Sequence, residues 1–109
     1  MIKLKKEFTK FGANYTQVYK NWLFSVYRID KEFQNGETGT WWEIFFIKTR
    51  DKDIYHDDEY EKYPADEDFG SWAWSCSTKG SLEKVLKREF PGFDEEYDEI
   101  LHICTDGVA

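Results

Sequence analysis

The sequence predicts an α+β fold, an antiparallel sheet of about four strands with one or two helices packed on one face. The first observation is the stretch 40–49, which is rich in aromatic and β-branched residues and contains no Pro or internal Gly. Such a composition is typical of a strand. Neither of its faces is polar through the middle, so this strand is expected to be central and covered on both sides. The second observation is a helical spacing of apolar residues that begins after Ser81 and stops at Pro91-Gly92.

A chain of 109 residues has the length of one domain, and residues 1–109 are interpreted as one. Aromatic residues make up 19% of the chain and there is a single Met. The core is therefore expected to be built mainly from Phe, Tyr and Trp rings, each of which buries about 150–250 Å². The strand residues predicted to be mainly buried are Trp41, Trp42, Phe45, Ile47, Trp72 and Trp74.

The formal net charge of −7 argues against direct binding to nucleic acid through a general basic field. The same sign favours attraction to basic proteins. Because the sequence shows neither a leader peptide nor an apolar run of membrane length, a cytoplasmic protein without a membrane partner is expected. The two cysteines, Cys76 and Cys104, are then interpreted as buried free thiols.

The N-terminal stretch 1–11 fits two structures. Leu4, Phe8 and Phe11 lie at helical spacing and Gly12 follows as a stop, which slightly favours a helix. Ile2 and Leu4 also alternate with lysines, which suits a strand instead.

The next stretches alternate in polarity and predict strands. A short strand is expected over 15–19 and a long one over 22–33, with a turn at Asn21 between them. The loop 34–39 contains two glycines, which favour positive φ angles. It is expected to join 22–33 to 40–49 as an antiparallel hairpin.

Residues 51–68 form the most unusual stretch. They contain nine acidic residues and two lysines, so they carry the whole excess negative charge of the chain. Tyr55, Tyr60 and Tyr63 lie among these acids, and Pro64 ends any helix. A long ordered loop or a broken helix is expected, because three Tyr would be unusual in a disordered tether. We call residues 51–68 the acidic segment.

The C-terminal third is expected to hold a strand and a helix. In 71–78, alternation places Trp72, Trp74 and Cys76 on one bulky face and small residues on the other. Ser81 suits the N-cap of the following helix.

Residues 95–105 fit either a second helix or a strand. Asp94 is a possible helix cap, and acidic residues at the start of this stretch suit the positive end of a helix dipole. An Asp106-Gly107 turn would instead suit the end of a strand.

The chain lacks a convincing catalytic or metal-binding pattern. Cys76 and His102 are candidates for nucleophilic chemistry, but Cys76 has no basic neighbour to activate it. The acids around Asp51 and His56 offer metal ligands, but the glycine and the final Glu of a calcium loop are missing. No catalytic residue, metal ligand or cofactor is therefore predicted, and an enzyme is the third hypothesis.

The acidic segment is the best candidate for a binding surface. Carboxylates interleaved with planar rings can imitate nucleic acid toward a basic groove, and Tyr rings are frequent interface anchors. A loop that serves only solubility explains the same composition. The predicted partner-binding residues are Asp53, Tyr55, Asp57, Asp58, Glu59, Tyr60, Glu61, Tyr63, Asp66, Glu67 and Asp68.

The order of several short motifs resembles small, mostly uncharacterised proteins that phages and other mobile elements encode. The motifs are Trp42-Glu43-x-Phe45-x-Ile47-Lys48, Tyr63-Pro64 and Phe69-Gly70-x-x-Ala73-Trp74, followed by the helix from Ser81. The resemblance covers about residues 22–90 and brings no catalytic residues with it. It implies a non-enzymatic inhibitor of a basic nucleic-acid-handling defence enzyme, of the anti-CRISPR or anti-restriction type. The alternative is an immunity protein that neutralises a toxin nuclease.

Overall fold

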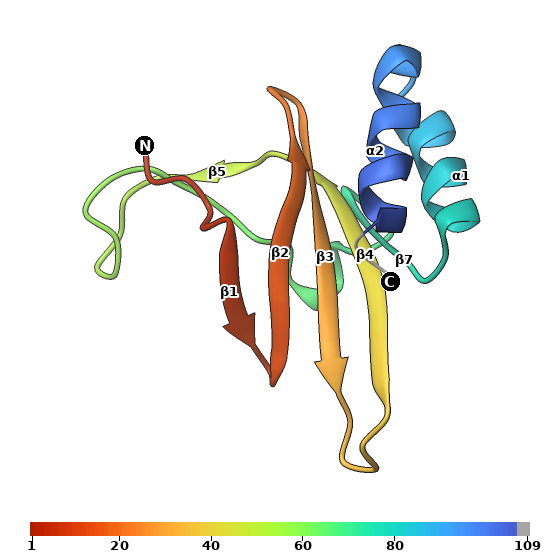
Figure 1. Cartoon of the computed structure of the whole chain (residues 1–109). Helices are drawn as coiled ribbons and strands as arrows, with labels where there is room; N and C mark the ends of the chain where they lie inside the picture. Colours follow the sequence, from red (N-terminus) through yellow and green to blue (C-terminus); the bar gives the residue numbers. More distant parts are fainter. Residues whose placement is uncertain (107–109) are drawn as a thin grey trace.

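The computed structural model describes the backbone of residues 1–106 and the side chains of residues 1–103. It has an α+β fold with a five-stranded antiparallel sheet in the order β1-β2-β3-β4-β7 and two helices (Figure 1). The sheet strands are β1 (Glu7–Lys10), β2 (Ala13–Lys20), β3 (Phe24–Glu32), β4 (Thr38–Phe46) and β7 (Ala73–Cys76). The remaining elements are β5 (Thr49–Arg50), β6 (Tyr60–Glu61), the 3-10 helix η1 (Asp66–Asp68), α1 (Lys79–Glu89) and α2 (Asp94–Asp106).

Strand β4 lies between β3 and β7, as its apolar faces predicted. It forms the expected antiparallel hairpin with β3, in which Tyr27 pairs with Glu43 and Ile29 with Trp41. The strand ends at Phe46 rather than at residue 49, because the chain leaves the sheet there and begins the separate pair β5–β6. Trp42, Phe45 and Trp72 are buried as predicted, and the other three predicted core residues are partly buried.

Helices α1 and α2 cover one end of one sheet face (Figure 1). Phe24 and Ile44 from the sheet pack against Leu86, Phe90 and Ile100 from the helical region. All five side chains are almost fully buried. This layer confirms the prediction that the helices pack on one face. Among the described residues, neither helix is long and apolar enough to cross a membrane.

The opposite face of the sheet is covered by the acidic segment and the N-terminal residues. Tyr27 and Phe45 point toward this side, where Phe8, Tyr63 and Trp72 pack against them. The part of the acidic segment around Tyr63 is therefore in the second layer of the fold. The ordered loop that the sequence predicted is present, with the short strands β5 and β6 and the 3-10 helix η1 in and around it.

The slight preference for a helix over residues 1–11 was wrong. Ile2 pairs with Tyr60, and β1 pairs with β2. This extended structure gives the backbone of Ile2 two hydrogen bonds, and it stacks the Phe8 ring on Tyr15 at 4.8 Å. Phe11, which completed the helical spacing, lies instead in the β1–β2 turn and is exposed.

Two details of the C-terminal third also differ from expectation. Trp72 packs on the face opposite to Trp74 and Cys76, because β7 begins only at Ala73, after a turn. The N-cap of α1 is Thr78, and Ser81 is the N3 residue of the capping box. The helix ends before Pro91 as predicted.

The ambiguous stretch 95–105 forms the helix α2, so the strand alternative was wrong. Cys76 is a buried free thiol, as expected, whereas the side chain of Cys104 lies outside the described residues.

Candidate functional site: the acidic segment

The first half of the acidic segment projects from the body of the protein. Strands β5 and β6 pair with each other, and the loop 51–59 that joins them extends away from the five-stranded sheet (Figure 1). We call residues 49–61 the acidic arm. The second half of the segment, residues 62–68, runs back over the sheet and includes η1.

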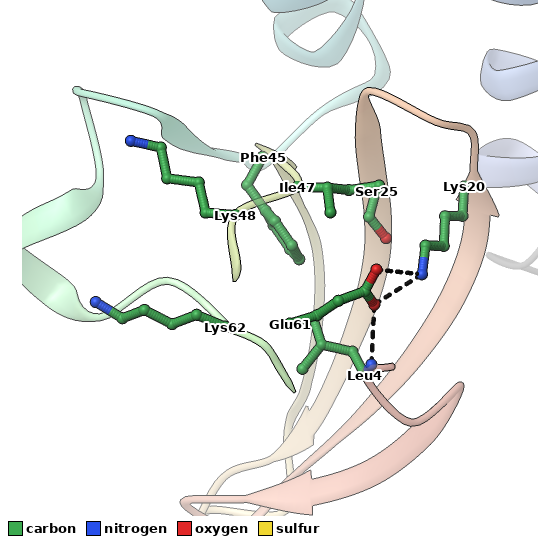
Figure 2. A pocket seen from close by; sticks show the side chains of 8 residues that line it. All are labelled: Leu4, Lys20, Ser25, Phe45, Ile47, Lys48, Glu61 and Lys62. Atoms are coloured by element: carbon green, nitrogen blue, oxygen red, sulfur yellow. Dashed lines mark hydrogen bonds and ion pairs between the residues drawn. The ribbon is translucent and has the colours of Figure 1, made fainter. Parts of the chain in front are cut away.

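The base of the acidic arm is fixed to the sheet by Glu61. Its carboxylate accepts hydrogen bonds from the Lys20 ammonium at 2.7 and 2.8 Å, and from the Leu4 backbone N–H at 3.0 Å (Figure 2). The Glu61 side chain is only 9% exposed, so this ion pair is shielded from water. Phe45 and Ile47 lie close by, and the site leaves no space for a bound ligand. Glu61 therefore acts in the structure as an attachment point.

Tyr63 anchors the second half of the segment. Its hydroxyl donates a 2.6 Å hydrogen bond to Oε1 of Glu43. Its ring packs edge to face with the Phe45 ring, with 4.9 Å between the two ring centroids. Oε2 of Glu43 accepts a second hydrogen bond from Nε1 of Trp41 at 3.0 Å. Burial, together with the Glu43 carboxylate, raises the pKa of Tyr63 far above its ordinary value. The Tyr63 ring thus belongs to the packed layer and does not project from the surface.

Asp68 closes the end of the segment. Its Oδ2 atom accepts a 2.9 Å hydrogen bond from the Ala65 N–H and lies 3.3 Å from Nζ of Lys62. The Ala65 N–H is the main cause of the lowered pKa of Asp68, and Lys62 contributes to it. Asp66 and Glu67, on the same short helix, are exposed.

Asp53 organises the tip of the acidic arm. Its carboxylate accepts a 2.8 Å hydrogen bond from the Tyr55 N–H and a 3.2 Å bond from the Tyr60 hydroxyl. Nδ1 of His56 lies 2.9 Å from Oδ1 of Asp53, and this contact is the largest cause of the lowered pKa of Asp53. The His56 ring stacks on the Tyr60 ring at 3.6 Å.

Two apolar side chains stand at this tip. Ile54 is 89% exposed and Tyr55 is 84% exposed. Tyr55 is among the predicted partner-binding residues, whereas Ile54 is not, because a lone Ile in a polar stretch normally predicts burial. The only local signal was its position directly after Asp53, a residue type that favours the first position of a turn.

The exposed acids divide into two groups. Asp58 accepts a 2.6 Å contact from the N-terminal ammonium of Met1, which lowers the pKa of Asp58. Asp53 is also exposed and contacts His56. The five remaining exposed acids of the acidic segment form no ion pair within the described part of the chain. They are Asp51, Asp57, Glu59, Asp66 and Glu67.

The candidate nucleophile and the candidate metal ligands lie in separate parts of the fold. Cys76 is 1% exposed on β7, and burial raises the pKa of its thiol to about 11. Within the described residues, no three His, Cys, Asp or Glu side chains converge in a way that could hold a metal ion. Of the acids proposed as metal ligands with His56, Asp53 contacts its ring, at 2.9 Å.

Comparisons of the chain with protein-family models, with curated proteins and with solved structures found no match.

Proposed function

We propose that this protein is a non-enzymatic binding protein that recognises a basic protein through the acidic segment. The partner class that we infer is a nucleic-acid-handling defence enzyme, which the protein inhibits in the manner of a phage or mobile-element anti-CRISPR or anti-restriction protein. The nucleic-acid groove of such an enzyme is basic, and its positive potential would attract the acidic segment.

One observation carries the proposal. Five exposed carboxylates of the acidic segment have no ion pair among the described residues, while other acids of the same segment, such as Glu61 and Asp68, hold it in place. A loop that served only solubility would need no such attachment, because mobile acids solubilise a protein equally well. The attached segment instead presents its free charges in a fixed arrangement, which favours electrostatic complementarity to one partner.

The proposal is tested by affinity capture from bacterial lysate on immobilised protein. The variant Asp51→Asn/Asp57→Asn/Glu59→Gln removes three unpaired charges from the acidic arm and keeps their shape. The matched control Glu7→Gln/Glu37→Gln/Glu99→Gln removes three exposed charges elsewhere, so the net charge of the two variants is the same.

We expect the wild type and the control to capture a basic nucleic-acid-handling enzyme, and the arm variant to capture at least ten times less of it. Equal capture by the arm variant and the control would show that only net charge matters, which contradicts the proposal. Capture of a toxin whose gene lies next to the gene for this protein would favour an immunity protein instead.

A further inference from the structure

The most exposed large apolar side chains of the acidic arm belong to two neighbouring residues. Ile54 and Tyr55 form the tip of the β5–β6 loop, and both are more than four-fifths exposed. Single exposed apolar residues are common on protein surfaces, but Ile is a poor choice for a loop tip that only needs to be soluble. The pair also has a fixed position, because the flanking residues Asp53 and His56 are hydrogen-bonded to each other.

The backbone of this tip is held on both sides. Asp53 and His56 exchange backbone hydrogen bonds of 3.2 Å in each direction, which closes a tight turn around Ile54 and Tyr55. The Asp53 carboxylate accepts the Tyr55 N–H inside this turn. These contacts fix the two residues without using either side chain.

The turn is connected to the body of the protein through Tyr60. The ring of Tyr60 stacks on the His56 ring, and its hydroxyl donates a hydrogen bond to the Asp53 carboxylate. Its backbone pairs with Arg50 within the acidic arm and with Ile2 from the N-terminal stretch. An apolar pair on such a support loses little conformational entropy when it binds, which is how preorganised loops gain affinity.

The charges around the tip define the partner. Asp51, Asp57 and Glu59 are exposed and unpaired within the described residues, and they lie in the loop that carries Ile54 and Tyr55. A matching surface therefore has an apolar pocket with Arg or Lys at its rim. Interfaces commonly combine an apolar anchor in a pocket with a polar rim of this kind.

We propose that the Ile54-Tyr55 turn is the anchor of the interface, and that it inserts into an apolar pocket surrounded by basic residues on the partner protein. This inference rests on the proposed function and adds to it the element that sets the lifetime of the complex. The carboxylates of the arm set the rate of encounter, and Asp53 is a positioning residue that acts through the turn.

The test uses the protein that the wild type captures from lysate at low salt and releases at high salt. Its association and dissociation rates are measured with the wild type and with Ile54→Ala/Tyr55→Ala. The control variant is Trp22→Ala, which removes an aromatic ring that is 79% exposed in the β2–β3 turn and is not part of the acidic arm. Urea unfolding of each variant confirms that the fold is intact.

The tip variant is expected to dissociate about 30-fold faster or more, with a nearly unchanged association rate, as for the loss of an interface hot spot. Trp22→Ala should dissociate like the wild type. Asp53→Ala should also dissociate faster, by less than the tip variant, because the turn loses one support and keeps its two anchors.

Three results would overturn the inference. If the arm-charge variant weakens capture but the tip variant dissociates at the wild-type rate, the proposed function stands and the anchor does not. If capture yields no protein that depends on the arm charges, the proposed function fails and the anchor fails with it. If sedimentation shows wild-type oligomers that the tip variant abolishes, a second copy of the chain occupies the tip.

Discussion

The Tyr63 hydroxyl donates a 2.6 Å hydrogen bond to Oε1 of Glu43, and this bond joins the acidic segment to the central strand β4. Glu43 is 9% exposed and receives no ion pair from the described residues, so its carboxylate depends on Tyr63 and Trp41 as hydrogen-bond donors. The buried carboxylate of Glu43 thus receives a hydrogen bond from a tyrosine of the acidic segment, in which Tyr55 is exposed.

Tyr63→Phe should therefore destabilise the protein by about 1–3 kcal/mol, because it removes a donor from a buried carboxylate and keeps the ring packing. The measurement is the free energy of unfolding in urea. The matched control Tyr55→Phe removes the hydroxyl of an exposed ring and should change stability by less than about 0.5 kcal/mol. Equal losses in both variants would show that Glu43 does not depend on Tyr63.

The β1–β2 turn should become more stable when Phe11 is replaced. Phe11 has a φ angle of +53° and is 80% exposed, and Gly12 beside it has a φ angle of +75°. Two positive φ angles favour Asn-Gly in a two-residue hairpin turn. Phe11→Asn is expected to raise the free energy of unfolding by about 1 kcal/mol.

Gly12→Ala is the matched variant in the opposite direction and should lower stability by about 1 kcal/mol. A lower melting temperature for Phe11→Asn would mean that the ring stabilises the fold, for example through Nζ of Lys10, which lies 5.2 Å from the ring centre.

The lowered pKa values of Asp53 and Asp68 predict that the acidic segment loosens in acid. A carboxylate with a lowered pKa in the folded state stabilises that state above its unfolded pKa of about 3.9, and the stabilisation is lost as the pH falls through the lowered pKa. The amide signals of Tyr55 and Ala65, which donate to these carboxylates, report the change by NMR.

Both amide signals should move with midpoints below about pH 3.9. In Asp53→Asn the titration at Tyr55 should disappear while that at Ala65 remains. Midpoints above this value would show that the two carboxylates are not held by the contacts described.

The thiol of Cys76 should react slowly. Its pKa is raised to about 11 by burial, so little thiolate forms at neutral pH, and its side chain is 1% exposed. In a Cys104→Ser background, a thiol reagent at pH 7–8 should modify the native protein at least about 100-fold more slowly than the urea-unfolded protein. Rapid modification of the native protein would contradict the structural role of Cys76.

The parts of the fold that follow from local patterns could be predicted from the sequence. Alternation located β3 and β4, and helical spacing with Pro91 located α1. The same spacing rule failed at residues 1–11, because three apolar residues match a helix by chance and the pairing of Ile2 with Tyr60 decides the structure. No local pattern signals a contact between residues so far apart.

The candidate site shows the same limit. Composition identified the acidic segment, but not which of its acids hold it in place. The ion pair between Lys20 and Glu61 joins residues that are 41 positions apart in the sequence. The hydrogen bond between Tyr63 and Glu43 joins residues that are 20 positions apart. Ile54 was missed because its exposure depends on a turn closed by Asp53. In the first two cases, a partner that is distant in sequence determines which side chain of the acidic segment is held in the fold.

The most direct test of the central claim is the association rate with the captured partner at increasing salt concentration. Screening shortens electrostatic reach to about 8 Å at physiological ionic strength, so an encounter steered by the acidic segment slows steeply as salt rises. The wild type and the Glu7→Gln/Glu37→Gln/Glu99→Gln control should share this steep slope. The Asp51→Asn/Asp57→Asn/Glu59→Gln variant should associate more slowly at low salt and show a clearly shallower slope. Identical slopes for the two triple variants would contradict the claim that the acidic segment is the interface.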